Sequence, residues 1–276
     1  MRVHDLLDGQ IIHDIGFGTY KLRGTQGVNA IVNALDVGYR TLDTAINYEN
    51  EGVVGEALRR SSVARDEIIV TSKLPGRYHG YEDALKAVQE SLFRLNVDQI
   101  DLYLIHWPNP SQDQYVEAWR ALIDAQKAGL IRSIGVCNFL PEHLERLKNE
   151  TGVLPVVNQI ELHPYFNQEA ARAYHREHGI ITEAWSPLGR ASAVIHDALL
   201  VDIAQRYNKT VPQIILKWHV QHGVVPIPKS SSVLRQKENL YIDDFELSAS
   251  DMTLIDGLTR EDGRLKDQNP AYFEDH

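Results

Sequence analysis

The sequence predicts an α/β protein with the (β/α)₈ or TIM barrel fold, a single domain over residues 1–276 that an N-terminal β-hairpin closes at one end. Two observations predict this fold. Short apolar runs alternate with amphipathic helical patterns along the whole chain, in about eight strand and helix units. The length of 276 residues also suits one barrel domain.

The predicted strands are runs of mainly apolar residues with few interruptions. Such runs are typical of parallel strands that are covered on both faces. In chain order they read IGFGTYKL, YRTLDTA, EIIVTSKL, QIDLYLIHW, IRSIGVCNF, VVNQIEL, IITEAWS and VVPIPKS.

Helices are predicted between these strands, because apolar residues repeat there at helical spacing. The clearest stripes are Val28, Ile31, Val32 and Leu35, then Leu85, Val88, Leu92 and Leu95, then Tyr115, Ala118, Trp119 and Leu122. Glycines stand where helical patterns stop, as a left-handed C-terminal cap requires: Gly38, Gly129, Gly152, Gly179 and Gly223. Pro141 and Pro212 stand near helix starts, where a missing N–H costs little.

The two ends of the chain are predicted to lie outside the repeating units. RVHDLLDGQIIHDI reads as a hairpin around Asp8 and Gly9 that closes one end of the barrel. The polar tail REDGRLKDQNPAYFEDH is expected on the surface, where it could overhang a site.

Composition excludes several classes of partner. The net charge of −10 disfavours nucleic acid and acidic membranes, and an anionic ligand would need a local basic pocket. The one cysteine, Cys137, cannot form an internal disulfide, and no apolar run approaches the ~18 residues of a membrane span. We expect a cytoplasmic, monomeric protein with no bound metal.

Polar side chains stand at the ends of three neighbouring predicted strands. Asp43 ends the second strand with Tyr48 just after it, Lys73 ends the third, and His106 ends the fourth. Because catalytic groups of such barrels come from these ends, the four are expected to converge. Taken singly, each has a structural alternative. Asp43 could be a cap or a salt-bridge partner and Tyr48 a packing ring. Lys73 could be a surface lysine and His106 a core histidine.

Together the four side chains suit proton donation. A tyrosine titrates near pH ~10, so donation at neutral pH needs a cation that stabilises the phenolate, and Lys73 can supply it. A buried lysine tends to lose its proton unless a carboxylate keeps it charged, so we assign that role to Asp43. His106 can orient a substrate carbonyl through a ring nitrogen.

The motifs LDTAINYENE, TSKL, DLYLIHWP, GVCNF, VNQIELHP, WSPLG and PKSSSVLRQKEN occur in this order. With them the chain resembles the aldo-keto reductases over essentially its whole length. Within that family, its motifs and short loops look most similar to the bacterial 2,5-diketo-D-gluconic acid reductases. The resemblance implies an NADP-dependent oxidoreductase with a tetrad of Asp43, Tyr48, Lys73 and His106, hydride from NADPH and a proton from Tyr48.

The resemblance also implies the contacts of the cofactor NADP. Asn138 and Gln159 would bind the nicotinamide carboxamide, Trp185 would stack on the ring, and Ser186 and Leu188 would belong to the pyrophosphate loop. The 2′-phosphate would be bound by Lys229, Ser230, Ser231 and Arg235, and the adenine by Glu238 and Asn239.

Charge pattern supports the phosphate assignment. Lys229 and Arg235 flank serines that can begin a helix, which gives free N–H groups beside two cations, although a solvated charged loop is the alternative. NADP is therefore favoured over NAD.

The chain departs from the family pattern at two places. Cys137 and Trp185 stand where serine and tyrosine are common, and Cys137 is as readily a small buried hydrophobe as a weak cofactor contact. The loop after WSPLG is short, which makes Arg190 a candidate for the phosphates.

Two other patterns are rejected. GFGTYK lacks the last glycine of a dinucleotide fingerprint and no helix follows its second glycine. The pairs His175 and His178, and His219 and His222, lack a third metal ligand, and we interpret them as exposed helix histidines.

The partner is expected to be a small-molecule carbonyl substrate. Tyr20, Tyr48, His106 and Trp107 would line the pocket, which suits aldehydes, methylglyoxal-like dicarbonyls and keto-sugar acids. Two competing functions stay open: a Schiff-base barrel aldolase that uses Lys73, and a non-catalytic nucleotide-binding regulatory barrel.

Overall fold

The computed structural model of the chain describes residues 2–191, 193–266 and 268–276. Its main sheet has eight strands, each parallel to its neighbour and in chain order, so the predicted strand order is confirmed. The strands are β3 Phe17–Gly18, β4 Thr41–Asp43, β5 Ile69–Leu74, β6 Ile100–Ile105, β7 Ile131–Cys137, β8 Val157–Glu161, β9 Ile181–Trp185 and β10 Val224–Pro226.

The sheet closes into a barrel through backbone hydrogen bonds between its first and last strands. The N–H of Gly16 donates to the carbonyl of Pro226, and that of Gly18 to the carbonyl of Pro228, both at 3.0 Å. A Cβ on Gly16 would lie 2.6 Å from the Cδ1 of Ile227, and one on Gly18 would lie 3.3 Å from the Ile227 carbonyl oxygen, so glycine suits this close approach. The glycines of GFGTYK therefore serve barrel closure.

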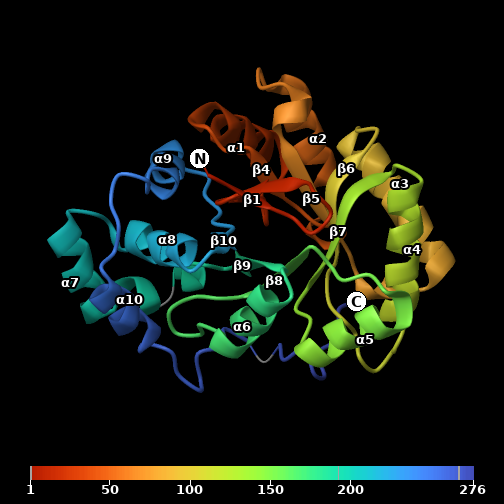
Figure 1. The fold of residues 1–276 in the computed structure, drawn as a ribbon. Helices are drawn as coiled ribbons and strands as arrows, with labels where there is room; N and C mark the ends of the chain where they lie inside the picture. The colour runs from red at the N-terminus through yellow and green to blue at the C-terminus, as the bar shows by residue number, and fades with distance from the viewer. Residues whose placement is uncertain (1, 192, 267) are drawn as a thin grey trace.

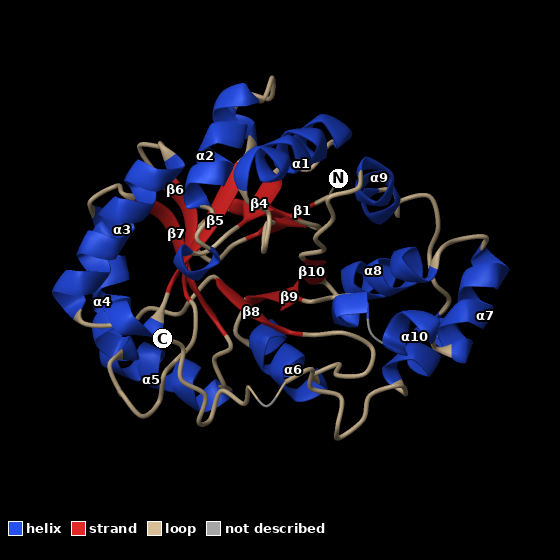
Figure 2. Cartoon of the chain, turned by 180° about the vertical axis from the view of Figure 1, so that it is seen from behind, coloured by secondary structure: helices blue, strands red, loops and turns tan. Residues whose placement is uncertain are grey.

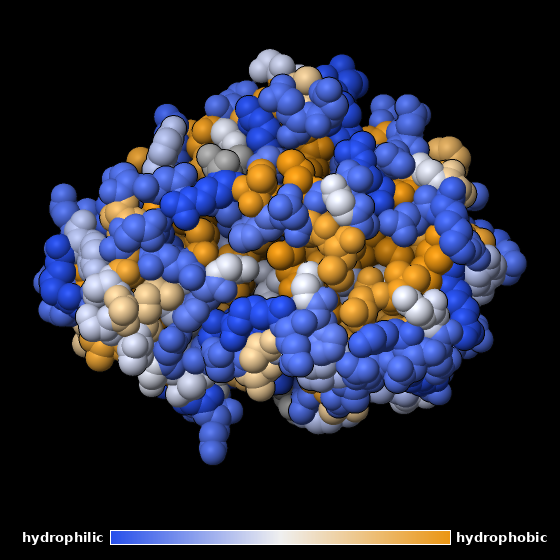
Figure 3. Space-filling model, viewed as in Figure 1, coloured by the Kyte–Doolittle hydropathy of each residue, from blue (hydrophilic) through white to orange (hydrophobic). Residues whose placement is uncertain are grey.

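Helices surround the strands, as Figures 1 and 2 show from opposite sides. They are α1 Gly24–Val37, α2 Glu51–Arg60, α3 Tyr81–Leu95, α4 Tyr115–Lys127, α5 Pro141–Thr151, α6 Glu169–Glu177, α7 Ala198–Tyr207, α8 Val211–Gln221, α9 Val233–Leu240 and α10 Ala249–Asp256. The predicted apolar stripes lie in α1, α3 and α4 and pack in one apolar cluster with residues of the strands. On the face shown in Figure 3, hydrophobic residues gather towards the middle and the rim is hydrophilic.

The predicted N-terminal hairpin is present. Its strands, β1 Val3–Asp5 and β2 Ile11–His13, pair antiparallel, and Gly9 in the turn has a φ of 81°. Ile12 is fully buried and Leu6 nearly so, in one apolar cluster with Leu102 and Leu104 of the barrel. The hairpin thus closes the end of the barrel at which the strands begin.

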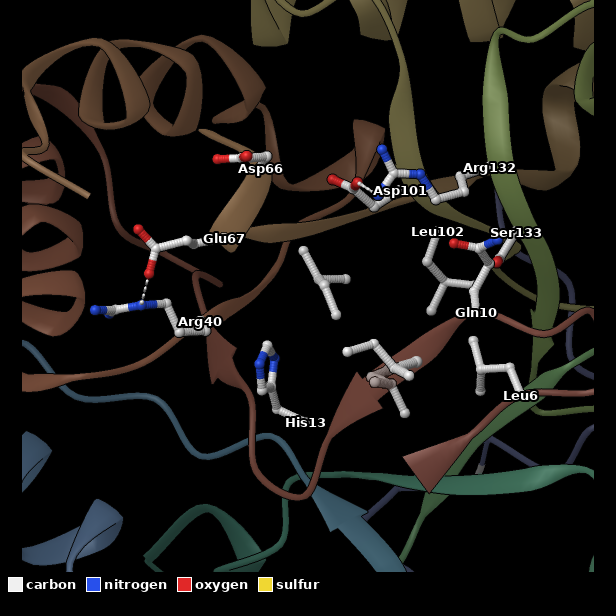
Figure 4. Close-up of a pocket in the computed structure, with 13 residues that line it drawn as sticks. Leu6, Gln10, His13, Arg40, Asp66, Glu67, Asp101, Leu102, Arg132 and Ser133 are labelled. Carbon is white, nitrogen blue, oxygen red and sulfur yellow. Dashed lines mark ion pairs between the residues drawn. The ribbon is translucent and has the colours of Figure 1, made fainter. Parts of the chain in front are cut away.

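A cavity of about 390 Å³ lies between this hairpin and the barrel (Figure 4). Two pairs of charged lining residues lie close together: Arg132 is 3.1 Å from Asp101, and Arg40 is 3.9 Å from Glu67. The lining residues that do not belong to the hairpin lie at or just before the beginnings of barrel strands, so the cavity lies at the end of the barrel away from the predicted site.

Among the described residues, no helix combines the length and the apolar character that crossing a membrane demands.

Candidate active site

The four predicted catalytic residues meet at the carboxyl ends of neighbouring strands. Asp43 is the last residue of β4, Lys73 is the penultimate residue of β5, and His106 follows β6 directly. Tyr48 ends the 3₁₀ helix Ile46–Tyr48, which follows β4. Parallel pairing of β4, β5 and β6 brings these ends to one edge of the barrel.

Lys73 and Asp43 form a buried ion pair. The Nζ of Lys73 lies 2.7 Å from the Oδ1 of Asp43 and also donates to the carbonyl of Thr44 at 2.8 Å. Burial is the largest single influence and would lower the pKa of Lys73, but the charge and hydrogen bond of Asp43, together with Tyr48 and Cys137, raise the pKa above its usual value. Lys73 therefore stays charged with no exposure to water.

Tyr48 lies against this ammonium group. Its hydroxyl is 3.5 Å from the Nζ of Lys73, and that cation also lies 4.9 Å from the centre of the Tyr48 ring. Burial raises the pKa of Tyr48 to about 12, while the Lys73 charge acts in the opposite direction. Tyr48 thus holds its proton at neutral pH, with a cation beside the oxygen that would carry charge after donation.

Two aromatic side chains pack against the ring of Tyr48. The ring of Tyr20 lies 5.0 Å from that of Tyr48, and the ring of His106 lies 6.0 Å from it, both edge-on. Tyr20 is about half exposed, whereas Trp107 is almost fully buried. Tyr48 therefore contacts both Tyr20 and His106, two of the side chains that were predicted to line the pocket.

The C-terminal tail crosses this site, which the sequence suggested without naming the residues. Leu265 donates its N–H to the carboxylate of Glu161, the last residue of β8, at 2.6 Å. Further along, the ring of Phe273 packs 4.4 Å from that of Trp107. The tail thus covers the wall that Trp107 was expected to present.

Asp275 brings a carboxylate to His106. Its Oδ2 lies 3.0 Å from the Nδ1 of His106. The tail is held there because Asn47 donates to the Oδ1 of Asp275 at 3.0 Å, and Asn109 both donates to and accepts from the Asp275 backbone. A Cβ on Gly76 would lie 2.4 Å from the Asp275 carbonyl, so the tail also needs glycine there.

Gln159 lies beneath the ion pair and links it to a second carboxylate. Its Nε2 donates to the Oδ2 of Asp43 at 2.8 Å and to the Oε2 of Glu183 at 2.7 Å. Burial, followed by the Asp43 charge, raises the pKa of Glu183 to about 7. Sequence reasoning did not single out Glu183.

Asn138 and Trp185 lie side by side at the ends of β7 and β9. The indole Nε1 of Trp185 donates to the Oδ1 of Asn138 at 2.8 Å, and the Nδ2 of Asn138 donates to the carbonyl of His106 at 3.0 Å. Asn138 and Ser186 both have left-handed backbones, with φ of 61° and 50°. This group therefore joins the tetrad directly.

The loop after β9 carries the residues that were expected to contact the phosphates. Arg190 is exposed, donates to the Oγ of Ser186 at 3.3 Å and lies 5.9 Å from the Trp185 ring. Leu188 is partly buried against the apolar core. Arg190 thus stands at the rim of the Trp185 surface, where a phosphate could reach it.

The predicted 2′-phosphate residues lie after β10 and in α9. Lys229, Ser231 and Arg235 are exposed, whereas Ser230 and Asn239 are buried and Glu238 lies between these extremes. Ser232 caps α9 by accepting the N–H of Arg235. No carboxylate of the described residues lies within ion-pair distance of Lys229 or Arg235, so both cations and a helix N-terminus fit a phosphate group.

The prediction that four helix histidines are exposed was wrong, because His178 and His222 are only partly exposed and the other two are buried. His175 and His219 are fully buried. Their ring nitrogens make hydrogen bonds inside the protein in place of hydrogen bonds to water. His175 contacts Asn158 at 2.9 Å and Thr182 at 2.8 Å, and His219 contacts the carbonyls of Ile215 and Leu162. Such pairing supports a neutral, structural imidazole.

Cys137 is buried and belongs to the apolar cluster of the barrel interior. Burial raises the pKa of its thiol. This packing favours the small-hydrophobe interpretation of Cys137. In the described part of the chain, no cluster of three or more histidine, cysteine or acidic side chains could hold a metal ion.

Comparisons with known proteins agree with this geometry. The sequence model of the aldo/keto reductase family matches residues 14–260. The 2,5-diketo-D-gluconic acid reductase B of Corynebacterium sp. (strain SHS752001) is 54% identical over 270 residues, which cover 98% of this chain and 97% of that protein. The methylglyoxal reductase DkgA of Escherichia coli (strain K12) is 44% identical over 269 residues, which cover 97% of this chain and 96% of that protein. A solved structure of a Gox0644 mutant in complex with NADPH has a TM-score of 0.93 at 42% identity, with 98% and 97% covered.

Proposed function

The chain belongs to the aldo/keto reductase family, and we propose that it reduces small aldehydes and ketones to alcohols with NADPH. The observation that carries this proposal is the Tyr48 hydroxyl beside the buried pair of Lys73 and Asp43. A group that donates a proton next to a fixed cation suits a carbonyl oxygen on which negative charge develops.

When bound, NADPH supplies the hydride that goes to the carbonyl carbon. Tyr48 donates its hydroxyl proton to the carbonyl oxygen, and Lys73 stabilises the resulting phenolate. Asp43 keeps Lys73 charged and in place. His106 positions the carbonyl oxygen by a hydrogen bond from its ring.

We propose the following contacts with the cofactor. Gln159 and Asn138 bind the carboxamide, and Trp185 stacks on the nicotinamide ring. Ser186 and Leu188 hold the pyrophosphate. The 2′-phosphate and adenosine residues are Lys229, Ser230, Ser231, Arg235, Glu238 and Asn239.

The substrates are proposed to be small dicarbonyls and keto-sugar acids, because relatives are named as a 2,5-diketo-D-gluconic acid reductase and a methylglyoxal reductase. Within this class, Asp275 favours uncharged dicarbonyls, since its carboxylate lies 3.0 Å from the ring that would position the substrate. Tyr20 and Trp107 form the remaining walls.

The test is purified protein with NADPH and methylglyoxal, followed by loss of NADPH absorbance, with Lys73→Met as the inactive control. Absence of turnover across a panel of aldehydes, dicarbonyls and keto acids would refute reduction. The raised pKa of Lys73 opposes the aldolase alternative, because a Schiff-base lysine must be uncharged. Borohydride trapping with a carbonyl substrate separates the two.

We also propose that the protein acts as a cytoplasmic monomer. Its single cysteine is buried and forms no disulfide, which suits a reducing compartment. Light scattering of the purified protein would test the monomer, and a stable dimer at low concentration would contradict it.

A further inference from the structure

A buried carboxylate that the proposed mechanism does not use lies directly beside the site. Glu183 is on β9, opposite Gln159 of β8 in the sheet register. Only 1% of its surface is exposed, and it shares the Nε2 of Gln159 with Asp43. Three strands therefore contribute to one hydrogen-bonded chain, from Asp43 through Gln159 to Glu183.

The donors and the acceptor of the Gln159 amide show how this hydrogen-bonded series can orient the amide. A primary amide has two N–H donors on its nitrogen and an acceptor on its oxygen. Both donors of Gln159 go to carboxylates, at 2.8 Å to Asp43 and at 2.7 Å to Glu183. Its Oε1 has no hydrogen-bond partner among the described residues and remains as an acceptor.

Two carboxylates at the same end of an amide determine its orientation. A flipped amide would turn Oε1 towards two acidic groups and leave both N–H donors without acceptors. With Asp43 alone, one N–H donor would lose its acceptor and the amide could rotate. Glu183 supplies the second bond that removes this freedom.

Burial of the Glu183 carboxyl group costs folding free energy, so packing alone does not explain a glutamate at this position. Its Oε1 is buried without a hydrogen-bond partner in the described structure. The titratable groups around it are Asp43 on β4, Lys73 on β5 and Cys137 on β7. Loss of water and the Asp43 charge both disfavour its ionised form, whereas Gln159 and Lys73 favour it.

We propose that Glu183 is a positioning residue: with Asp43 it fixes the Gln159 amide so that Oε1 accepts from the carboxamide N–H of the nicotinamide. This inference rests on the proposed function, in which Gln159 contacts that carboxamide. Glu183 touches neither the substrate nor the reacting atoms.

The test compares two variants at position 183 that both remove its charge. Glu183→Leu has no acceptor for Gln159, whereas Glu183→Gln keeps a carbonyl oxygen that can take the same bond. We expect Glu183→Leu to raise the Kd of NADPH about tenfold, the effect of one lost hydrogen bond, and Glu183→Gln to retain most of the affinity. Both are measured by fluorescence titration, with Gln159→Ala as the reference for complete loss of the contact.

A ligand without nicotinamide separates positioning from general damage. Adenosine 2′,5′-bisphosphate uses the phosphate and adenine contacts alone, so its Kd should be the same in wild type and in both variants. Equal weakening of NADPH and this ligand in Glu183→Leu would overturn the inference. So would wild-type NADPH affinity in Glu183→Leu while Gln159→Ala is impaired. Should Gln159→Ala bind NADPH normally, the carboxamide assignment of the proposed function fails instead.

The pH dependence of folding stability tests whether the variants have removed the buried carboxyl group. A purely structural role of Glu183 predicts the same result. The pKa of Glu183 is raised in the folded state, so its contribution to stability is present below the unfolded pKa and is lost as pH rises through about 7. Both variants should remove this dependence, yet only Glu183→Leu should weaken NADPH. If Glu183→Leu does not fold, Glu183→Met, of similar length and also without an oxygen, takes its place under the same criteria.

Discussion

Replacing Tyr48 with phenylalanine tests the centre of the proposed mechanism. The change keeps the ring contacts with Tyr20 and His106 and deletes one hydroxyl. The hydroxyl is 3.5 Å from Lys73, and Lys73 keeps shorter bonds to Asp43 and Thr44, so we expect stability to fall by less than ~1 kcal/mol. A positioned general acid contributes ~10²–10⁴-fold in rate, equivalent to about 2.7–5.4 kcal/mol of activation free energy. We therefore expect kcat to fall by ~10²–10⁴-fold or more.

The assay is single-turnover oxidation of NADPH with a dicarbonyl, alongside NADPH Kd and thermal unfolding. Tyr103→Phe is the matched control, because it also deletes a buried tyrosine hydroxyl, one that contacts Ser91 at 3.0 Å. With a pKa of about 12, the Tyr48 acid predicts a rate that stays flat through neutral pH and falls only near that value. If Tyr48→Phe kept most of the wild-type rate, and that rate fell with rising pH where histidines titrate, the acid would be His106.

Three further predictions concern the groups around this centre. Lys229→Ala and Arg235→Ala should each weaken NADPH binding about tenfold or more while NADH binding stays the same; equal losses for both cofactors would remove the 2′-phosphate assignment. Asp43→Asn should lower kcat, NADPH affinity and the free energy of unfolding, the last by up to ~3 kcal/mol in denaturant titrations, because Asp43 pairs with Lys73 and also accepts from Gln159. Asp275→Asn should raise kcat/KM for a keto acid relative to methylglyoxal by roughly fivefold, since it removes a negative charge beside the site; an unchanged ratio would show that Asp275 does not select by charge.

The fold could be predicted because it depends on local patterns. Apolar runs gave all eight strands, although the structure shortens them: IGFGTYKL reduces to Phe17–Gly18, because Tyr20, Lys21 and the residues beyond turn towards α1. The tetrad followed from the rule that parallel strands end at one edge of a barrel. Depth in the core was harder to judge: His175 and His219, predicted to be exposed, are buried, and His178 and His222 are only partly exposed. The rings of His175 and His219 each find at least one partner on another element, which no helical pattern reveals.

Asp275 could not be found from the sequence, whereas Glu183 could. The position of Asp275 depends on the path of residues 268–276, which is fixed by contacts with Asn47 and Asn109, residues that lie far away in the chain. Glu183, by contrast, is a carboxyl inside IITEAWS, a run that reads as a strand covered on both faces. Side chains alternate along a strand, so Glu183 must share a face with Trp185, already assigned to the cofactor. A charged residue two positions before a cofactor contact therefore faces the barrel interior beneath the site, where a carboxylate is costly unless it orients something above it.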